Sequence, residues 1–394
     1  MELLRMDDQA RRALEYVVEI RGQDMSKLRR LTLATLLLVF FTIGRVGAAE
    51  WQSEWESALK GAKKEGKVVI AIPPSAELRK ELEPLLKQKF GIEAELVVSR
   101  GADSANRIAS EFKAGVRYFD MIIQGTTTAM SLQDGGMLDA VSSYMILPEV
   151  KDPKYWWGGH IWNDNLKTNR FLYSFVANAG TEGLFYNAEL AKPEELRSFD
   201  DLLNPKWKGK IGLNDPRIGG SGISLWSFMW ETKGEEYLQK LVQQDLFLSR
   251  NLRQIADALA KGKLAITIGL GRAEYEPFMS AGLPVKEVPR PKEGLPASSG
   301  YGVLGIVKDP PHPNTTKVFV NWFLGKEGQE FYAKVMKQGT RRLDVDTKWM
   351  RAEGVDAAKD VMTIAEYNRV RNHLEDKVIN VRRPAAKFAE KVLQ

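Results

Sequence analysis

A run of small residues stands where a predicted strand, Lys210–Leu213, gives way to a predicted helix. The run consists of Gly219, Gly220, Ser221 and Gly222. Small side chains let backbone N–H groups approach an anion at the positive end of a helix. Arg217, just ahead of the run, supplies a weaker cation. The pattern predicts an anion-binding loop, and its alternative is a flexible loop in which Ser221 caps the helix.

Arg272 and Tyr275 follow the apolar segment Leu264–Ile268, which is predicted to be a strand. The planar guanidinium of an arginine suits a carboxylate, phosphonate or sulfonate. Both residues, together with Glu276, would share one face of a helix that begins after the strand. We expect Arg272 and Tyr275 to contact a ligand. The alternative is a surface ion pair between Arg272 and Glu276.

Polar residues also follow the predicted strands of the N-terminal half. They are Ser75, Arg100, Thr126 and Thr127. Small hydroxyl side chains at these places can donate to a ligand, although they are equally ordinary helix caps. Tyr301, at the start of the apolar segment Tyr301–Val307, is a further candidate. These five residues complete the predicted ligand site.

Catalytic motifs are missing from the sequence. It contains no HExxH motif, no serine in a glycine elbow and no cysteine. Of the three histidines, His312 lies between prolines and His373 in a charged tail. His160 belongs to an aromatic cluster, residues 155–162, that is more typical of packing than of a cleft wall. Because distant carboxylates can converge, an exported hydrolase remains the least favoured alternative, and no catalytic residue, cofactor or metal ligand is predicted.

These candidates need a scaffold that gathers the ends of strands. Apolar runs at Lys67–Ile72, Glu93–Val98 and Phe119–Ile123 alternate with helical stripes. Strand–helix alternation with continuously apolar strands predicts a parallel, doubly wound α/β sheet. The order repeats between Lys210 and Ile268, which predicts a second α/β lobe. Ligands bind at the carboxyl ends of such strands, so the site is expected in a cleft between the two lobes.

The chain is predicted to divide into four parts. Residues 1–49 form an N-terminal extension and signal peptide, residues 50–178 with 302–338 form lobe one, and residues 179–301 form lobe two. Residues 339–394 form a helical tail that packs on the lobes. The extended segments Leu172–Tyr186 and Tyr301–Val307 are the predicted hinge strands between the lobes.

The segment Lys27–Ala49 has the layout of a secretory signal. Basic residues precede an apolar run, Leu31–Gly44, and Gly47 and Ala49 stand at the −3 and −1 positions of a cut before Glu50. The run of 14 residues is too short to cross about 30 Å of hydrocarbon as a helix. We expect a cleaved signal and a start at Met25, with an uncleaved anchor as the alternative. Arg29-Arg30 leaves twin-arginine export open.

Composition limits the possible partners. Residues 1–49 hold 8 Lys/Arg and 6 Asp/Glu, so residues 50–394 carry 49 basic and 45 acidic side chains, a net charge of +4. Such a small excess, without a basic patch, does not indicate nucleic-acid binding. The lack of cysteine excludes disulfides, thiolate metal sites and a lipid-anchored cysteine. An exported, unanchored, monomeric protein of the periplasm is the expected class.

Five segments, in this order, resemble the bacterial ABC-importer solute-binding proteins of the family that includes the ferric-ion-binding proteins. They are WESALKGAKKEGKVVIAI, FDMII, NPKWKGKIGLNDPRIGGSG, ALAKGKLAITIG and HPNTTKVFVNWFLGKEGQEFY. The resemblance implies a type II periplasmic-binding fold, with two α/β lobes that close on a ligand and deliver it to an inner-membrane permease. A receptor-coupled sensor uses the same fold. The ligand expected from the candidate residues is a small organic anion.

The sequence departs from the metal-binding members of that family. They hold ferric iron with two adjacent tyrosines after the strand that corresponds to Leu264–Ile268, and some add a histidine near the first strand. This chain has Tyr275 alone at the former place and no histidine at the latter. One phenolate is a poor cage for a hard ferric ion. Ferric iron is therefore the alternative ligand.

Overall fold

The computed structural model describes residues 50–99, 101–166, 169–180 and 182–393. The chain divides into two units, residues 1–57 and residues 58–394. The first is described only at residues 50–57, which are helical. The expected signal peptide and Arg100 lie outside the described residues. Among the described residues, no helix combines the length and the apolar character needed to cross a membrane.

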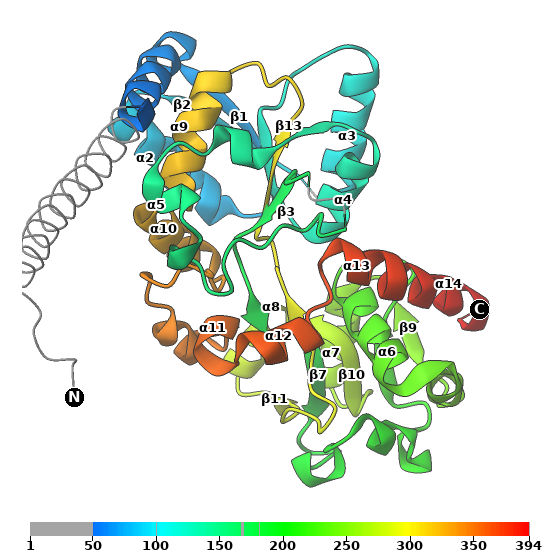
Figure 1. Ribbon diagram of the computed structural model, residues 1–394. Helices are drawn as coiled ribbons and strands as arrows, with labels where there is room; N and C mark the ends of the chain where they lie inside the picture. The colour runs from blue at the N-terminus through cyan, green and yellow to red at the C-terminus, as the bar shows by residue number, and fades with distance from the viewer. Residues whose placement is uncertain (1–49, 100, 167–168, 181, 394) are drawn as a thin grey trace, which may run out of the picture. The chain divides into compact units, whose positions relative to one another are not determined.

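The first lobe of the unit 58–394 is built on a six-stranded sheet in the order β2-β1-β3-β13-β4, with β5 also paired to β13. Its strands are β1 (Lys67–Ile72), β2 (Glu93–Val98), β3 (Met121–Gln124), β4 (Leu138–Asp139), β5 (Leu172–Ser174) and β13 (Val303–Val307). Its helices are α2 (Ala76–Phe90), α3 (Gly101–Lys113), α4 (Thr126–Asp134), α5 (Pro148–Lys151), α9 (Pro313–Leu324) and α10 (Lys326–Met336). Helices cover both faces of the sheet, with α2 and α9 on one side and α3 and α4 on the other (Figure 1).

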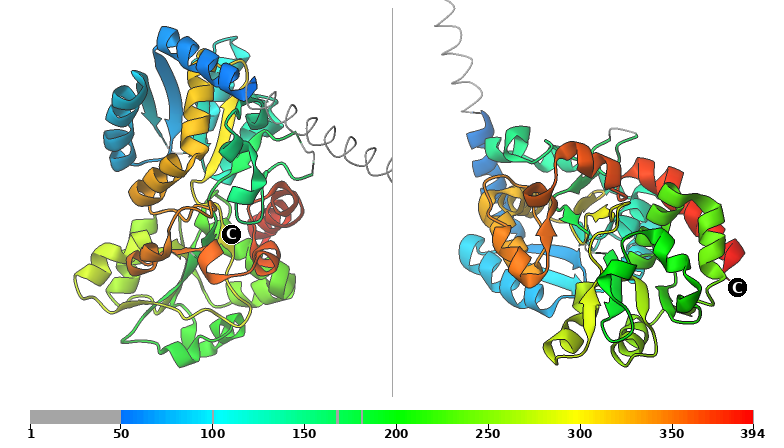
Figure 2. Two further views of the ribbon diagram at one scale, coloured as in Figure 1. Left: turned by 60° about the vertical axis from the view of Figure 1, so that its left-hand side comes forward. Right: turned by 90° about the horizontal axis from the view of Figure 1, so that it is seen from below.

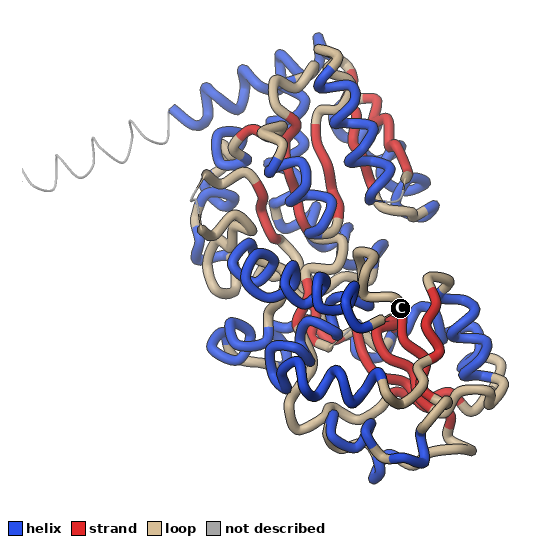
Figure 3. The backbone as a smooth tube through the Cα atoms, turned by 90° about the vertical axis from the view of Figure 1, so that its right-hand side faces the viewer, coloured by secondary structure: helices blue, strands red, loops and turns tan. Residues whose placement is uncertain are grey.

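The second lobe is built on a five-stranded sheet in the order β11-β7-β10-β8-β9. Its strands are β7 (Glu182–Asn187), β8 (Ile211–Asn214), β9 (Phe247–Ser249), β10 (Ile266–Gly271) and β11 (Val285–Glu287). Its helices are α6 (Ser221–Val242), α7 (Leu252–Ala260) and α8 (Arg272–Ser280). Gly234, at φ 81°, interrupts the helical backbone of α6. The strands of both lobes lie between layers of helix (Figure 3).

Neither sheet is purely parallel, although the sequence predicts parallel strands. β1 is parallel to β2 and β3, but β13 runs antiparallel to β3. In the second lobe β10 is parallel to β8 and antiparallel to β7. Continuous apolar runs report burial on both faces of a strand and carry no information about its direction. β13 runs antiparallel to β3 because it enters the first sheet as the chain returns from the second lobe.

A small three-stranded sheet joins the lobes. It has the order β12-β6-β14, with β6 (Asn178–Ala179), β12 (Ala297–Ser298) and β14 (Asp356–Ala357). Each strand comes from one of the three passages of the chain between the lobes. The backbone hydrogen bonds of this sheet therefore tie all three passages together.

The chain beyond the first lobe is mostly helical. It contains α11 (Ala358–Val361), α12 (Ile364–Val370), α13 (Glu375–Lys377), a π-helical turn (Val378–Arg382) and α14 (Arg383–Val392). Short 3₁₀ turns lie at Val141–Tyr144, Pro153–Tyr155, Pro193–Glu195, Phe199–Leu203, Pro205–Trp207 and Lys348–Glu353. The C-terminal helices lie beside α6, as Figures 1 and 2 show, and Arg383 pairs with Asp134 at the end of α4.

Two adjacent arginines of this C-terminal part, Arg341 and Arg342, are fully buried. Arg341 is 0% exposed, and its guanidinium donates to the carbonyl oxygens of Ser174, Trp157 and Gly159 at 2.9, 2.7 and 3.0 Å. Burial lowers its pKa. Carbonyl dipoles replace the carboxylate that a buried cation usually requires. The side chain fixes the segment after α10 to the aromatic cluster of residues 155–162.

Candidate functional site, a cleft between the lobes

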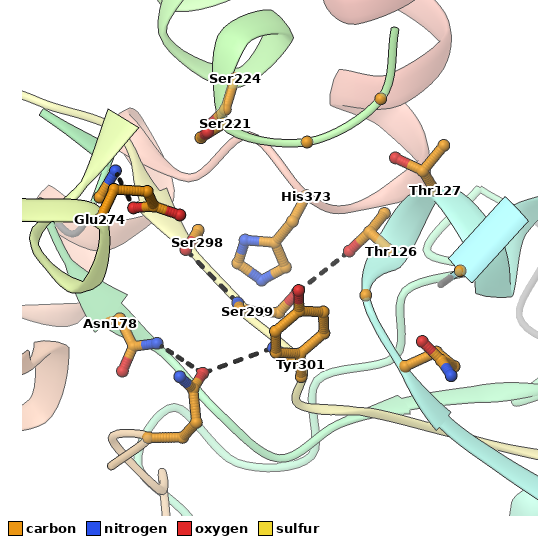
Figure 4. A pocket seen from close by; sticks show the side chains of 18 of the residues that line it. Thr126, Thr127, Asn178, Ser221, Ser224, Glu274, Ser298, Ser299, Tyr301 and His373 are labelled. Carbon is orange, nitrogen blue, oxygen red and sulfur yellow. Dashed lines mark hydrogen bonds between the residues drawn. The ribbon is translucent and has the colours of Figure 1, made fainter. Parts of the chain in front are cut away.

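A cavity of about 1260 Å³ lies between the two lobes of the unit 58–394. The first lobe lines it with the starts of α3 and α4, and the second with the starts of α6 and α8. The small joining sheet and the C-terminal part supply the remaining wall. Figure 4 shows the polar side chains that face this space. The volume is above the roughly 300–1,000 Å³ of a typical small-molecule site, so the cleft has room for an organic ligand and is far larger than a single metal ion requires.

Two helix N-termini from different lobes meet at one end of the cavity. A Cβ placed on Gly219 would lie 3.5 Å from Cγ2 of Thr127, so the first turns of α6 and α4 approach each other across the cleft. Their cap residues, Gly220 and Gly125, give no side-chain hydrogen bond to the helix. The first-turn N–H groups of both helices therefore lack a side-chain cap and point their dipoles at the same space.

One interpretation of the sequence makes Ser221 the N-cap of α6, but the structure shows that it is not. The cap is Gly220, whose φ of 106° only glycine adopts without strain. The Ser221 hydroxyl instead donates to the carbonyl oxygen of Gly269 at 2.7 Å, and it accepts from Asn214 at 3.2 Å. These contacts fix the small-residue loop against the adjacent strand β10.

Arg272 lines the cavity from the first turn of α8. Its Nε lies 3.2 Å from a carboxylate oxygen of Glu276, the pairing that the sequence left as an alternative. The guanidinium also rests on bare backbone, because a Cβ on Gly354 would lie 2.1 Å from its Nε. A pair this exposed is weak, so the guanidinium can exchange Glu276 for a ligand at small cost.

Carboxylates occupy the wall beside Arg272. Glu274 accepts a hydrogen bond from the Gly271 N–H at 3.0 Å, and its carboxylate faces the cavity in Figure 4. Burial raises its pKa, opposed by backbone hydrogen bonds. Burial also raises the pKa of Glu287, opposed by the charge of Arg272. This wall can therefore accept hydrogen bonds from a ligand.

Neutral polar groups form the floor. The hydroxyls of Thr126 and Ser299 are 3.0 Å apart, which links the first lobe to the crossing segment after β12. His373 lies in the middle of the view in Figure 4. Its Nε2 is 2.9 Å from the Tyr367 hydroxyl and its Nδ1 is 3.3 Å from the Ala297 carbonyl oxygen. Burial lowers the pKa of His373 to about 3, so the floor carries no imidazolium charge at neutral pH.

Six of the predicted ligand residues line this cavity. They are Thr126, Thr127, Gly220, Ser221, Arg272 and Tyr301. Four others have different surroundings. Ser75 caps α2 by accepting from the Leu78 N–H at 3.0 Å. Gly222 packs on strand β8, where a Cβ would lie 2.5 Å from the Asn214 carbonyl oxygen.

Arg217 is committed to an ion pair. Its Nε lies 2.8 Å from Asp215, which Arg250 also contacts at 2.9 Å. Although burial acts in the opposite direction, hydrogen bonds from these two arginines hold the pKa of Asp215 at about 2. A carboxylate that remains ionised keeps Arg217 paired, which leaves it as a support of the loop ahead of α6.

Tyr275 lies in the core of the second lobe. Its side chain is 0% exposed, its ring stacks on Phe185 at 4.3 Å, and its hydroxyl is hydrogen-bonded to Thr267. Burial raises its pKa beyond the normal range of a phenol. Around the axis of α8, Tyr275 and Glu276 lie on opposite sides of Arg272, so the three side chains do not point in one direction. Tyr275 points toward the sheet, whereas Arg272 and Glu276 point outward. Among the described residues, no group of three or more His, Asp or Glu side chains is arranged to hold a metal ion.

The sequence did not indicate several residues of the cavity wall. Ser298 and Ser299 stand just ahead of Tyr301, where a pair of hydroxyls at a crossing could have been noticed. Glu274 stands three residues after Gly271, the spacing of a capping box. Asn372 and His373 have no local signal, because only the packing of the C-terminal part brings them to the cleft.

The family model for bacterial extracellular solute-binding proteins matches residues 77–361. The chain belongs to this family. The fold agrees with that of solved periplasmic binding proteins. It is similar to AfuA from Actinobacillus pleuropneumoniae, solved with exogenous fructose-6-phosphate, at 18% identity and a TM-score of 0.58, covering 82% of this chain and 99% of that one. It is also similar to iron-bound HitA from Pseudomonas aeruginosa, at 16% identity and a TM-score of 0.60, covering 83% and 99%.

Two further similarities complete the comparison. The substrate-binding protein of an ABC transporter from Agrobacterium tumefaciens has a TM-score of 0.63 at 14% identity, covering 86% of this chain and 97% of that one. An uncharacterized protein of Haemophilus influenzae is 28% identical over 161 residues, 39% of this chain and 43% of that protein's length. This solute-binding protein therefore shares its fold with binders of chemically different ligands, and its own ligand has to be argued from its cavity.

Proposed function

We propose that this solute-binding protein works in the periplasm, where it captures a small organic anion and delivers it to the permease of an ABC importer. The ligand is of the carboxylate, phosphonate, phosphate-ester or sulfonate type and also carries hydrogen-bond donors. The observation that supports this proposal is the meeting of two uncapped helix N-termini, those of α4 and α6, across one cleft.

An anion held between α4 and α6 would accept hydrogen bonds from both lobes at once. The N–H groups of Thr127 and Ser221 stand in the first turns that face each other. Helix dipoles and unpaired N–H groups favour negative charge at this place. Arg272 would add a charge-assisted bond to the same ligand after leaving Glu276. Glu274 and Glu287, on the wall beside Arg272, would accept from hydroxyl or amino groups of the ligand.

Binding to both lobes provides the energy for closure. A ligand shifts an equilibrium between open and closed forms only by its difference in affinity for the two. Contacts from α4 and α6 together exist only when the lobes are close, so the ligand stabilises the closed form. A permease that recognises the closed arrangement would then receive loaded protein in preference to empty protein.

A thermal-shift screen followed by calorimetry tests this proposal. The purified protein is mixed with carboxylates, phosphonates, phosphate esters, sulfonates, polyamines and ferric citrate. Only anions that also carry hydroxyl or amino groups should raise the melting temperature. The gain in the free energy of unfolding should follow RT ln(1 + [L]/Kd). Stabilisation by polyamines alone, or by none of the anions, would contradict the proposal.

Arg272→Ala is the first variant for calorimetry. We expect it to weaken binding of the anion about tenfold or more, equivalent to about 1.4 kcal/mol, because a charge-assisted contact is lost. Arg79→Ala is the matched control, since Arg79 forms the same i, i+4 pair with Glu83 at 3.1 Å on α2. Equal affinity of the two variants would remove Arg272 from the site.

The alternatives have distinct results in the same experiments. A ferric transport protein would be stabilised by ferric citrate and would show a charge-transfer colour. An exported hydrolase would convert its ligand to product, whereas a binding protein returns it unchanged. Tyr275, the one phenol expected near an iron site, is buried and hydrogen-bonded to Thr267, which favours the organic anion.

A further inference from the structure

The C-terminal residues 371–393, here called the strap, contact both lobes. The strap comprises α13, the π-helical turn and α14, drawn in red in Figure 1, where it lies beside α6 and near the end of α4. Three of its residues, Asn372, His373 and Arg382, also line the ligand cavity. Any change in the distance between the lobes must therefore alter at least one of the contacts that the strap makes.

The strap is attached to the second lobe through apolar packing. Phe388 stacks on Trp226 of α6 with ring centroids 6.5 Å apart, and the Trp226 indole N–H donates to the Ala385 carbonyl oxygen at 2.9 Å. Ala389 and Leu393 are buried in the same core cluster. Separating these surfaces would expose apolar area to water, so the strap moves with the second lobe.

The strap touches the first lobe through polar groups, both at the end of α4 and in the segment 163–166. Arg383 forms an ion pair with Asp134, and the two side chains are 49% and 45% exposed. The buried carboxylate of Glu375 accepts from the Gln133 side-chain amide at 3.1 Å and from the Leu166 N–H at 2.9 Å. The exposed ion pair exchanges for water with little change in free energy, and water replaces the partners of Glu375 when the two surfaces separate, so this junction can open and close reversibly.

We propose that the strap is a latch that is fixed to the second lobe and engages the end of α4 when the cleft is closed. Helix α4 presents Thr126 and Thr127 to the cavity at its first turn and Gln133 and Asp134 to the strap at its last. Ligand and latch thus act on opposite ends of one rigid helix and favour the same closed arrangement. Arg383 and Glu375 are positioning residues for α4. The coupling to ligand rests on the proposed function, but the latch itself operates without ligand.

Distances between spin labels on the two lobes test the latch in the ligand-free protein. Because the chain has no cysteine, Lys80→Cys on α2 and Gln239→Cys on α6 give two unique, exposed labelling positions. Pulsed dipolar spectroscopy should detect the separation seen in this structure as one population. We expect Arg383→Asp, and separately Asp134→Arg, to raise the ratio of open to closed forms about threefold or more. Combining both reversals should restore the original ratio.

Lys377→Glu is the matched control. Lys377 pairs with Glu231, which joins the strap to the second lobe, so its reversal should leave the distance distribution unchanged. Glu375→Gln, a change of nearly equal volume, should shift the ratio in the same direction as Arg383→Asp.

Each of the following results would overturn the latch. They are a wild-type distribution that lacks the closed separation, unchanged distributions in the single reversals, and a Lys377→Glu variant that opens as much as Arg383→Asp. A double reversal that does not recover the closed population would also contradict it. If the latch variants behave as expected while no anion binds, the proposed ligand class fails and the latch stands.

Discussion

Acidification should destabilise this protein through His373, and the effect can be calculated from its surroundings. The side chain is 1% exposed, and burial lowers its pKa from 6.5 to about 3. The folded protein therefore keeps His373 neutral, whereas the unfolded chain binds a proton below about pH 6.5. Between pH 6.5 and 3 the unfolded state holds more protons, so stability is complete above this range and falls as the pH falls.

The size of the loss follows from the two pKa values. One pH unit between the two pKa values corresponds to about 1.4 kcal/mol. Lowering the pH from 7.5 to 5.0 should therefore reduce the free energy of unfolding by about 2 kcal/mol through this residue alone. Continued acidification toward pH 3 would raise the loss to about 4 to 5 kcal/mol.

Urea unfolding followed by tryptophan fluorescence at several pH values between 7.5 and 5.0 measures this effect. The His373→Gln side chain can still form hydrogen bonds but has no group that titrates in this range. Between pH 7.5 and 5.0 the free energy of unfolding of the variant should therefore fall by about 2 kcal/mol less than that of the wild type. Burial also lowers the pKa of His160, but that residue is present in both proteins and cancels in the difference. Parallel stability curves for the two proteins would refute the reasoning.

Two further predictions concern buried polar side chains. Tyr275→Phe should lower the free energy of unfolding by about 1 kcal/mol, because the Thr267 hydroxyl loses its partner, and should leave the affinity for a ligand unchanged in calorimetry. A loss of affinity would instead return Tyr275 to the site. Arg341→Met should cost about 3 kcal/mol or more, because the carbonyl oxygens that accept from it become unpaired. Chemical denaturation measures this cost, Arg341→Lys should recover only part of it, and a neutral effect of Arg341→Met would contradict the bonding described.

Local patterns in the sequence located most of the scaffold. The apolar runs at Lys67–Ile72 and Glu93–Val98, bounded by glycine and proline, coincide with β1 and β2. Strand direction was beyond reach, because burial on two faces looks alike in parallel and antiparallel strands. β13 shows this limit most clearly, since its direction depends on the path of the chain through the second lobe before it returns to the first sheet.

The sequence could predict only those residues of the candidate site that directly follow a strand. Thr126, Thr127 and Arg272 each follow a strand directly, and the fold carries all three to one cleft. Tyr275 also follows a strand, but helical geometry directs its side chain to the core. His373 comes from a stretch whose neighbours are charged, and nothing in that stretch reveals that Tyr367 and Ala297 surround it. Contacts between distant segments decide such positions.

The small sheet β12-β6-β14 also has a mechanical consequence. Three independent tethers would allow the halves of the unit to slide or shear past each other, but tethers that share backbone hydrogen bonds bend together. Relative motion is then reduced to a swing about an axis through this ribbon, so residues near Asn178 are displaced little while those at the rim travel furthest.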